Sequence, residues 1–330
     1  MATITVLMPC RNAERYIRET IDSVLVQTFR DFKFLIIDDG SDDQTSSIVD
    51  AYASRDARIK VVHRSPSAGV AASLNLGLSI AETKLVAQIH ADDRMKPHRL
   101  ERQIAFMQEH PEIAVASSFV HLINQEGRRV GVFRSEFITH DSIDRCLREN
   151  HLIGFHHPAV IMRRDEIIEV GGYRNISCCE DLDLWNRLVE SGHRILVQPE
   201  FLIDYRIHDT AISTKQSWTQ MLQSRWIYDS MIRRRRGEPE LSWDAFLQKE
   251  NDAPVLSRLN RIRKSYAEVL YKLAATDFAC RRYIATFTVL SAAAILAPYI
   301  TIRKAFGKSL FAEKLRTILL ALRSSNQNLN

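Results

Sequence analysis

The sequence predicts an α/β fold in which a mostly parallel central sheet is flanked by helices and followed by an α-helical C-terminal extension. Over the first two thirds of the 330 residues, short apolar runs of strand length alternate with amphipathic segments of helix length. This alternation is typical of βαβ units and of a parallel sheet. Beyond residue 215 almost every segment has helical spacing. The composition, 45% hydrophobic and 26% charged, is that of a folded protein.

The first two strands of the predicted sheet are the apolar runs 3–8 and 34–38. Pro9 is expected to end the first run, because proline cannot donate to a sheet ladder. Between these strands, residues 14–28 carry apolar side chains at helical spacing, which predicts an amphipathic helix. A second helix over 43–54 begins with acidic residues, which the positive end of the helix dipole favours.

Three more strands and two more helices continue the alternation. Residues 59–63 predict a third strand, and residues 69–81 predict the helix after it. Residues 85–90 are an apolar run that predicts a fourth, buried strand. A helix over 97–110 and a strand over 113–117 follow.

The segment after residue 118 is less regular. Residues 119–133 favour a hairpin that turns at Glu126-Gly127, and residues 159–162 favour a strand. A helix is expected over 180–191, and a final strand over 201–207.

The charge is divided unevenly along the chain, although the net charge is only +5. Residues 1–214 contain 25 Lys+Arg and 31 Asp+Glu, a balance of −6, whereas residues 215–330 contain 20 and 9, a balance of +11. An acidic front part suits a metal site, and a basic tail suits phosphate-bearing surfaces. We therefore predict a catalytic domain over 1–214 and a basic helical region over 215–330.

The five cysteines form no CxxC pair, and their number is odd. A disulfide framework or a zinc site is therefore not expected, and a reducing cytoplasm is the predicted location. Residues 1–5 lead directly into the first strand, so we expect no signal peptide.

Polar residues follow three of the predicted strands at the point where each strand ends. Arg11 follows the first strand, Asp38 and Asp39 end the second, and Asp92 and Asp93 follow the fourth. Parallel strands share a carboxyl edge, where open α/β sheets bind their ligands, so we expect an acidic crevice of nucleotide size. Two adjacent carboxylates repel each other. A divalent cation that also binds phosphate oxygens would compensate this repulsion and explain the acid pair. A solvated Asp-Asp turn is the alternative.

These motifs, together with others along the chain, resemble those of family 2 glycosyltransferases, which are inverting enzymes of GT-A (nucleotide-diphospho-sugar transferase) fold. The resemblance covers residues 3–214 in the family's order. The matching segments are Val6-Leu-Met-Pro-Cys-Arg-Asn12, Ile36-Ile-Asp-Asp-Gly-Ser-Asp-Asp43, Gly69-Val-Ala-Ala-Ser-Leu-Asn-Leu-Gly77, Ala91-Asp-Asp93 with Pro97 and Arg99-Leu100, His157-Pro158, Val170-Gly-Gly-Tyr173, Glu180-Asp-Leu-Asp-Leu-Trp185 and Tyr205-Arg-Ile-His208.

The resemblance implies a donor site and a metal site. The donor site, for a nucleotide-sugar and most simply a UDP-sugar, would be made by Pro9, Arg11, Glu14, Asp38, Asp39, Asn75 and Asp92. Within it, Asp38 or Asp39 would hold the uracil or the ribose. The metal site, for Mn²⁺ or Mg²⁺, would be made by Asp92, Asp93 and His208.

The acid pair Glu180-Asp181 matches the family motif whose aspartate is the general base, so the resemblance assigns the base to Asp181. Inverting transfer needs a base that takes the proton of the acceptor hydroxyl, and it needs an electrophile that neutralises the departing nucleoside diphosphate. The acceptor would be a hydroxyl of a glycan or of a lipid-linked sugar. Taken without the family, the pair could also be the acidic first turn of a helix.

One residue departs from the family pattern. Relatives often read Asp-Ala-Asp-Asp where this chain reads His90-Ala-Asp92-Asp93. Imidazole is a poorer ligand than carboxylate for Mg²⁺ but is acceptable to Mn²⁺. Which of Asp92 and Asp93 binds the metal directly is left open by the sequence.

Residues 283–302 form an uncharged stretch of 20 residues between two basic clusters. A helix of this length could span a bilayer, but positive charge normally marks only one end of a span. A helix that lies on the inner face of the cell membrane fits both facts better, and an anionic membrane surface would then be a partner. A helix buried against the catalytic domain is the alternative.

Four other functions are weaker interpretations of the same sequence. A dehydrogenase or a sugar nucleotidyltransferase would show a glycine-rich loop after the first strand, where this chain has Pro9-Cys-Arg11. A nucleic-acid-binding protein is not expected, because the basic run 233–236 has no aromatic platform beside it. A non-catalytic nucleotide-binding or membrane scaffold would follow if His90 has silenced the metal site.

Overall fold

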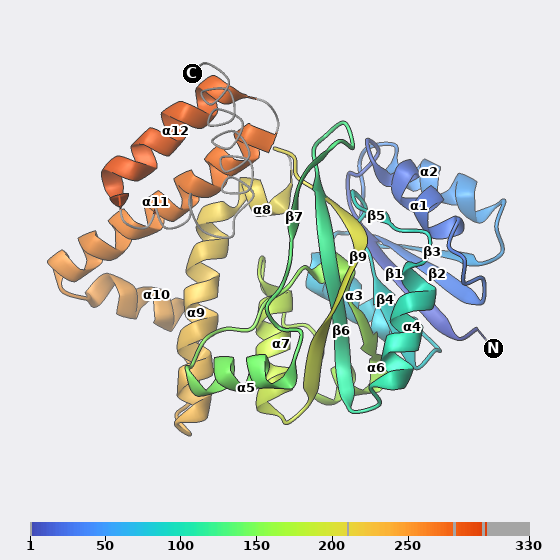
Figure 1. The fold of residues 1–330 in the computed structure, drawn as a ribbon, viewed down its shortest axis with the longest axis horizontal. Helices are drawn as coiled ribbons and strands as arrows, with labels where there is room; N and C mark the ends of the chain where they lie inside the picture. Colours follow the sequence, from blue (N-terminus) through green and yellow to red (C-terminus); the bar gives the residue numbers. More distant parts are fainter. Residues whose placement is uncertain (1, 210, 280–281, 299–300, 302–330) are drawn as a thin grey trace, which may run out of the picture. The chain divides into compact units, whose positions relative to one another are not determined.

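The computed structural model describes residues 2–209, 211–279, 282–298 and 301 (Figure 1). The chain forms two compact units. The first contains Met1–His121 and Arg134–Tyr205, and the second contains Leu122–Phe133 and Arg206–Asn330. The predicted division at residues 214 and 215 remains a prediction about domains.

The first unit is built around a sheet whose strands lie in the order β3-β2-β1-β4-β8-β6-β9-β5. The four strands at one end are parallel, and they are β1 (Ile4–Cys10), β2 (Phe32–Asp38), β3 (Ile59–His63) and β4 (Leu85–Gln88). All four agree with the predicted strands. Strands β1, β2 and β4 are mostly buried apolar runs, whereas β3 at the end of the sheet is partly exposed.

Pro9 does not end the first strand as predicted, because β1 continues through it to Cys10. On one side Pro9 pairs with Ile37 of β2. On the other side the pairing with β4 ends at Leu7. Beyond Leu7, β1 is therefore no longer paired with β4. Pro9 lies in this part of the strand, where proline is tolerated as it is at a sheet edge.

The other half of the sheet is antiparallel. Here β8 (Ile161–Arg163) pairs with β4 and with β6 (Ile113–Ile123), and β5 (Arg94–Met95) pairs with β9 (Arg194–Arg206). The strands predicted at β6 and β9 were too short. Both strands extend beyond the apolar residues on which the predictions rested. The two-residue β5 has no apolar pattern and was missed.

Helices α1 (Ile17–Leu25), α2 (Thr45–Ala53), α3 (Val70–Ile80), α4 (Arg99–Glu109) and α7 (Glu180–Glu190) confirm predicted helices. The sequence missed α5 (His140–Arg148) and α6 (Arg164–Glu169), and it also missed the short 3-10 helix His157–Ala159.

The core of the first unit lies where α3 and α7 pack their apolar sides. Leu74 and Leu78 of α3, Trp185 of α7 and Leu7 of β1 belong to one buried cluster. Helix α3 approaches β1 so closely that a Cβ on Gly77 would lie 2.3 Å from Leu7 Cδ1.

The second unit contains a hairpin and a series of helices. The end of β6 pairs with β7 (Arg129–Phe133) around a turn at Gly127, which confirms the predicted hairpin. The helices are α8 (Ile212–Lys215), α9 (Ser217–Arg235), α10 (Trp243–Asp252), α11 (Val255–Ala279) and α12 (Tyr283–Leu296). Helices α11 and α12 pack side by side (Figure 1).

The basic run at the end of α9 is paired with acidic side chains of the same unit. Arg233 contacts Asp229 and Glu238, and Arg234 contacts Glu240. This arrangement agrees with an ion-paired helix end.

Among the helices that the structure describes, none has the length and apolar character needed to cross a membrane. Helix α12 covers 14 residues of the uncharged stretch 283–302. Positions 299, 300 and 302 of that stretch lie outside the described residues.

Candidate active site

The ends of β2, β1 and β4 lie side by side, as the sequence predicted. Cys10 pairs with Asp38 in parallel register, and the next amide, of Asp39, donates to the Cys10 carbonyl at 2.9 Å. On the other side of β1, Leu7 pairs with Gln88, the last residue of β4. The residues that follow these three strands therefore emerge at one edge of the sheet, the usual place for a ligand.

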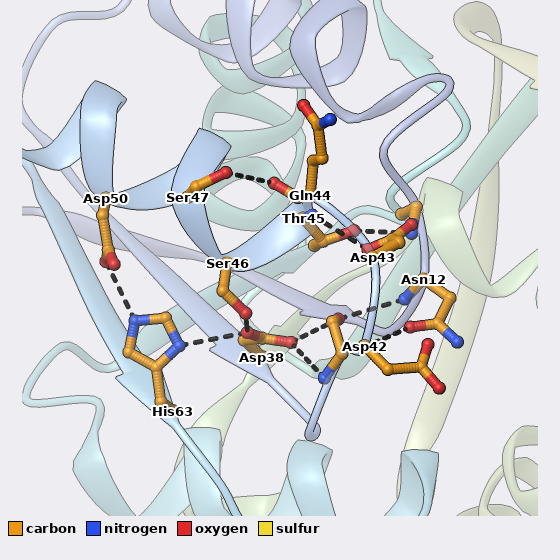
Figure 2. A network of polar contacts seen from close by, with 12 residues as sticks. Asn12, Asp38, Asp42, Asp43, Gln44, Thr45, Ser46, Ser47, Asp50 and His63 are labelled. Carbon is orange, nitrogen blue, oxygen red and sulfur yellow. Dashed lines mark hydrogen bonds and ion pairs between the residues drawn. The ribbon is translucent and has the colours of Figure 1, made fainter.

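Asp38 is buried and accepts hydrogen bonds at both carboxylate oxygens (Figure 2). Ser41 Oγ donates to Oδ1 at 2.5 Å, and Ser46 Oγ donates to Oδ2 at 2.5 Å. Burial alone would raise the pKa of Asp38, but the hydrogen bonds from Ser41, Ser46 and His63 outweigh it and lower the pKa. The Asp38 carboxylate therefore stabilises the turn after β2 through its hydrogen bonds to Ser41 and Ser46.

His63 is a member of this network that the sequence did not reveal. Its Nδ1 lies 3.0 Å from Asp38 Oδ2, and its Nε2 lies 2.9 Å from Asp50 Oδ1 (Figure 2). The hydrogen bond to Asp50 raises the pKa of His63 more than its partial burial lowers it, and Asp38 adds to the increase. The one available signal was register, because His63 ends β3 opposite Asp38.

Asp39 holds the start of helix α3. Its carboxylate accepts from Ser67 Oγ at 2.6 Å and from the backbone amides of Ala68 and Gly69 at 3.0 and 2.8 Å. Arg64 Nη1 lies 3.4 Å from the same carboxylate. Burial would raise the pKa of Asp39, but these hydrogen bonds lower it.

The segment after β1 is hydrogen-bonded to the turn after β2. The Asn12 amide donates to Ser41 Oγ at 3.0 Å, and Glu14 Oε2 accepts from the Gln44 amide at 3.0 Å. Arg11 is exposed, and its Nη1 donates to Ser67 Oγ at 3.1 Å. Pro9 lies half-buried within β1. The structure thus brings Arg11 and Asp39 together through Ser67.

His90, Asp92 and Asp93 form a group with metal-binding geometry after β4. Each offers one ligand atom, and these atoms all lie within 4.8 Å of one another. Asp93 is fully buried, whereas His90 and Asp92 are partly exposed. Burial lowers the pKa of His90, which favours the neutral imidazole that metals bind. Sequence reasoning noted His90 as a departure but did not count it among the ligands.

Arg99 is a buried cation behind this group. Its Nη2 donates to the Val160 carbonyl at 3.0 Å, and its Nε donates to Gln103 Oε1 at 2.9 Å. Burial lowers the pKa of Arg99 to about 9, although the charge of Asp93 opposes the shift. The guanidinium therefore offsets part of the negative charge that the carboxylates place at this edge.

Aromatic side chains connect the metal-type group with the candidate base. The rings of His90 and His157 meet edge to face at 5.4 Å between centroids. His157 Nε2 lies 2.8 Å from the hydroxyl of Tyr173, which is buried. Glu180 and Asp181 are near enough to Tyr173 for their charges to raise its pKa, after burial, which is the larger cause.

Glu180 and Asp181 begin helix α7, directly after Cys179 in a left-handed conformation at φ 62°. Burial and the charge of Asp181 raise the pKa of Glu180 to about 8. Burial raises the pKa of Asp181 to about 6. The two adjacent carboxyls are coupled, so the pair as a whole loses its protons at higher pH than two free carboxyls would.

The sequence also predicted Asn75 and His208 as site residues. The side-chain amide of Asn75 is hydrogen-bonded to the backbone of Tyr173. His208 is buried and belongs to the second unit, and its role in a metal site remains a prediction.

The comparisons with known proteins point in one direction. A sequence model of the family described as "Glycosyl transferase family 2" matches residues 5–169, half of the chain. TuaG of Bacillus subtilis, whose name assigns it as a glycosyltransferase to teichuronic acid biosynthesis, is 30% identical over 232 residues. That match covers 70% of this chain and 88% of TuaG.

Two solved structures share the fold. Residues 1–349 of S. aureus TarS, in complex with UDP-GlcNAc, match with a TM-score of 0.55 and 19% identity, over 87% of this chain and 90% of that one. The mannosyltransferase PcManGT of Pyrobaculum calidifontis, in complex with GDP-Man and Mn²⁺, matches with a TM-score of 0.52 and 17% identity, over 97% and 81%. The predicted GT-A-type fold is therefore confirmed.

Proposed function

The chain belongs to glycosyl transferase family 2 and is a glycosyltransferase, and from that premise we propose that it transfers a sugar from a UDP-sugar to a hydroxyl with inversion. The acceptor is a glycan or a lipid-linked sugar, and a divalent cation assists. The observation that carries this proposal is the gathering of Arg11, Asp39 and the His90–Asp92–Asp93 group at the carboxyl edge of adjacent parallel strands.

The donor nucleotide lies along this edge. Asp38 and Asp39 use their carboxylates to shape the turns that meet there, and Arg11 adds a positive charge at the rim. An exposed guanidinium suits a base or phosphate contact. TarS was crystallised with UDP-GlcNAc and PcManGT with GDP-Man, which supports a nucleotide-sugar as the donor.

We propose His90, Asp92 and Asp93 as the metal ligands. The donor set fits a divalent cation, because it offers one imidazole and two carboxylates within ligand distance of one another. A bound cation would neutralise the charge of the leaving diphosphate. The imidazole favours Mn²⁺ over Mg²⁺, and PcManGT was crystallised with Mn²⁺.

Asp181 is the base in this proposal. The residue is partly exposed, and burial raises its pKa to about 6, which makes the carboxylate a stronger base than a free one and suits proton abstraction from a hydroxyl. Glu180 lies beside it at the start of the same helix. A single base suffices, because no covalent glycosyl-enzyme forms in a direct displacement.

The test begins with nucleotide-sugars screened for thermal stabilisation of the full chain in the presence of Mn²⁺. Donors that stabilise the chain are then assayed for transfer to glycan and lipid-linked hydroxyls, and NMR gives the anomeric configuration of the product. We expect a UDP-sugar to bind and the product to be inverted. A product with retained configuration would refute the direct displacement. Donor binding without turnover under any metal would instead support the scaffold function.

The second unit supports a location on the cytoplasmic face of the cell membrane. Ile284, Phe287 and Ile295 of α12 recur at helical spacing, and each is largely exposed, Ile284 to 87%. Leu256 and Leu259 add exposed apolar area on α11. Together with the +11 balance of residues 215–330, this pattern suits an interfacial helix on anionic lipid. Membrane contact would bring the enzyme to a lipid-linked acceptor.

A further inference from the structure

The turn Val170–Tyr173 is bound from one side by Arg187 of helix α7. Arg187 Nη1 donates to the Val170 carbonyl and Nη2 donates to the Gly172 carbonyl, each at 2.6 Å. Its Nε donates to Asp183 Oδ2 at 2.7 Å, one turn earlier on the same helix. The guanidinium is almost fully buried, so these bonds are shielded from water.

The same turn is bound from the other side by Asn75 of helix α3. The Tyr173 amide donates to Asn75 Oδ1 at 2.9 Å, and Asn75 Nδ2 donates to the Tyr173 carbonyl at 2.7 Å. Gly172 has φ +65°, and a Cβ there would lie 2.6 Å from Asn75 Oδ1. The turn is therefore fitted to the Asn75 side chain, and both polar ends of the amide are engaged.

These two helices begin at the two halves of the active site. The two amides just before α3, of Ala68 and Gly69, donate to Asp39, on the donor side. The first turn of α7 carries Glu180 and Asp181, on the acceptor side. Between them, Tyr173 is fixed at its backbone by Asn75 and at its hydroxyl by His157. Helix α3 and these partly or fully buried hydrogen bonds thus connect the donor carboxylate with the helix of the base.

We propose that Asn75 and Arg187 are positioning residues that clasp the turn 170–173 and thereby fix Asp181 relative to the bound donor. The proposal rests on the assignment of Asp181 as the base. It gives Asn75 a role in the chemical step through Tyr173, in place of the donor contact that the family resemblance implied. Transfer is sensitive to such placement, because an error of about 1 Å in a reacting group can cost about 100-fold in rate.

The experiment compares Asn75→Ala and Asn75→Asp with a control on the same helix. Asn75→Asp is nearly isosteric and keeps the acceptor for the Tyr173 amide, but it places an oxygen against the Tyr173 carbonyl. Leu78→Val removes buried apolar volume from the same cluster but no hydrogen bond to the turn, so it is the control for loss of stability. Arg187→Gln tests the other side of the clasp.

We expect both Asn75 variants and Arg187→Gln to lower kcat for transfer by about 10- to 100-fold. The KM for the donor should change by less than about twofold, and Leu78→Val should keep kcat. Amide hydrogen exchange should become faster in the peptide that covers 170–183. If Asn75→Ala does not fold, Asn75→Asp carries the test, with circular dichroism as the check of folding.

Three outcomes decide the matter. A wild-type kcat in the Asn75 and Arg187 variants would refute the proposed positioning role of these two residues. A raised donor KM with unchanged kcat would also overturn it, and would restore Asn75 as a donor-binding residue. Failure of the base assignment is separately visible, because Asp181→Asn would then retain wild-type transfer, whatever the Asn75 variants do.

Discussion

Asp181 and Glu180 are adjacent carboxyls whose pKa values are both raised by burial, and this shift predicts a pH profile for transfer. The base works only when it is ionised, so kcat/KM should fall about tenfold per pH unit below an apparent pKa of about 6. Asp181→Asn should lower kcat by about 100-fold or more. Glu180→Gln is the matched control, because it removes the neighbouring carboxyl in the same first turn of α7 and leaves the proposed base in place. An equal loss in both variants would contradict the assignment.

His90 determines the metal preference in our interpretation of the site. The wild-type enzyme should transfer faster with Mn²⁺ than with Mg²⁺, because imidazole is the poorer ligand for Mg²⁺. His90→Asp restores a carboxylate, and it should raise the Mg²⁺/Mn²⁺ ratio of kcat/KM by about tenfold. His90→Ala is the control, and it should lower activity with both metals. An unchanged ratio in His90→Asp would remove His90 from the metal site.

At the scale of elements, His63 joins the end of β3 to the turn after β2 and to α2 (Figure 2). Its pKa is raised in the folded chain, so its ionic contribution is fully present below about pH 6.5 and is lost as pH rises through the folded pKa. The ring is partly exposed, so we expect at most about 1 kcal/mol. Urea unfolding of His63→Gln should therefore show a larger deficit against wild type at pH 6 than at pH 9. A deficit that grows with pH would contradict this interpretation.

The approach of α3 to β1 predicts a stability effect that a second substitution can reverse. Gly77→Ala would place a methyl group 2.3 Å from Leu7 Cδ1, and it should lower the free energy of unfolding by about 1–3 kcal/mol. In a Leu7→Ala background the space is already open, so the same change should cost far less. Urea denaturation of the two single variants and the double variant measures the coupling. Additive losses would show that the contact is relieved elsewhere.

The elements that could be predicted are those whose burial leaves a local pattern. Strands β1 to β4 are apolar runs, and α1 to α4 repeat at helical spacing. Helix α6 escaped prediction because six residues are too few to show a period. The candidate ligands Asp92 and Asp93 were visible because two acids end a strand. The clasp of Asn75 on Tyr173 joins residues 98 positions apart, and no local pattern could have revealed it.

At the scale of the whole molecule, the division of charge found in the sequence acquires a structural counterpart. The acidic part carries the strand ends and the candidate base, where a cation and a diphosphate would compensate the carboxylates. The basic part carries the exposed apolar residues of α11 and α12. Arg263 of α11 donates to the Leu296 carbonyl at the end of α12 at 2.7 Å. The two helices therefore present their apolar side chains from one connected hairpin.

This hairpin leads to a prediction about lipid binding by the full chain. The double variant Ile284→Ser with Phe287→Ser removes two largely exposed apolar side chains. It should weaken sedimentation with vesicles of phosphatidylcholine and phosphatidylglycerol about tenfold or more. Val26→Ser removes an exposed apolar side chain from the first unit and should leave sedimentation unchanged. Binding should weaken with added salt and on pure phosphatidylcholine, because the basic residues attract anionic lipid. If the wild-type chain sediments with neither kind of vesicle, the exposed residues of α12 do not bind lipid, and the acceptor need not be lipid-linked.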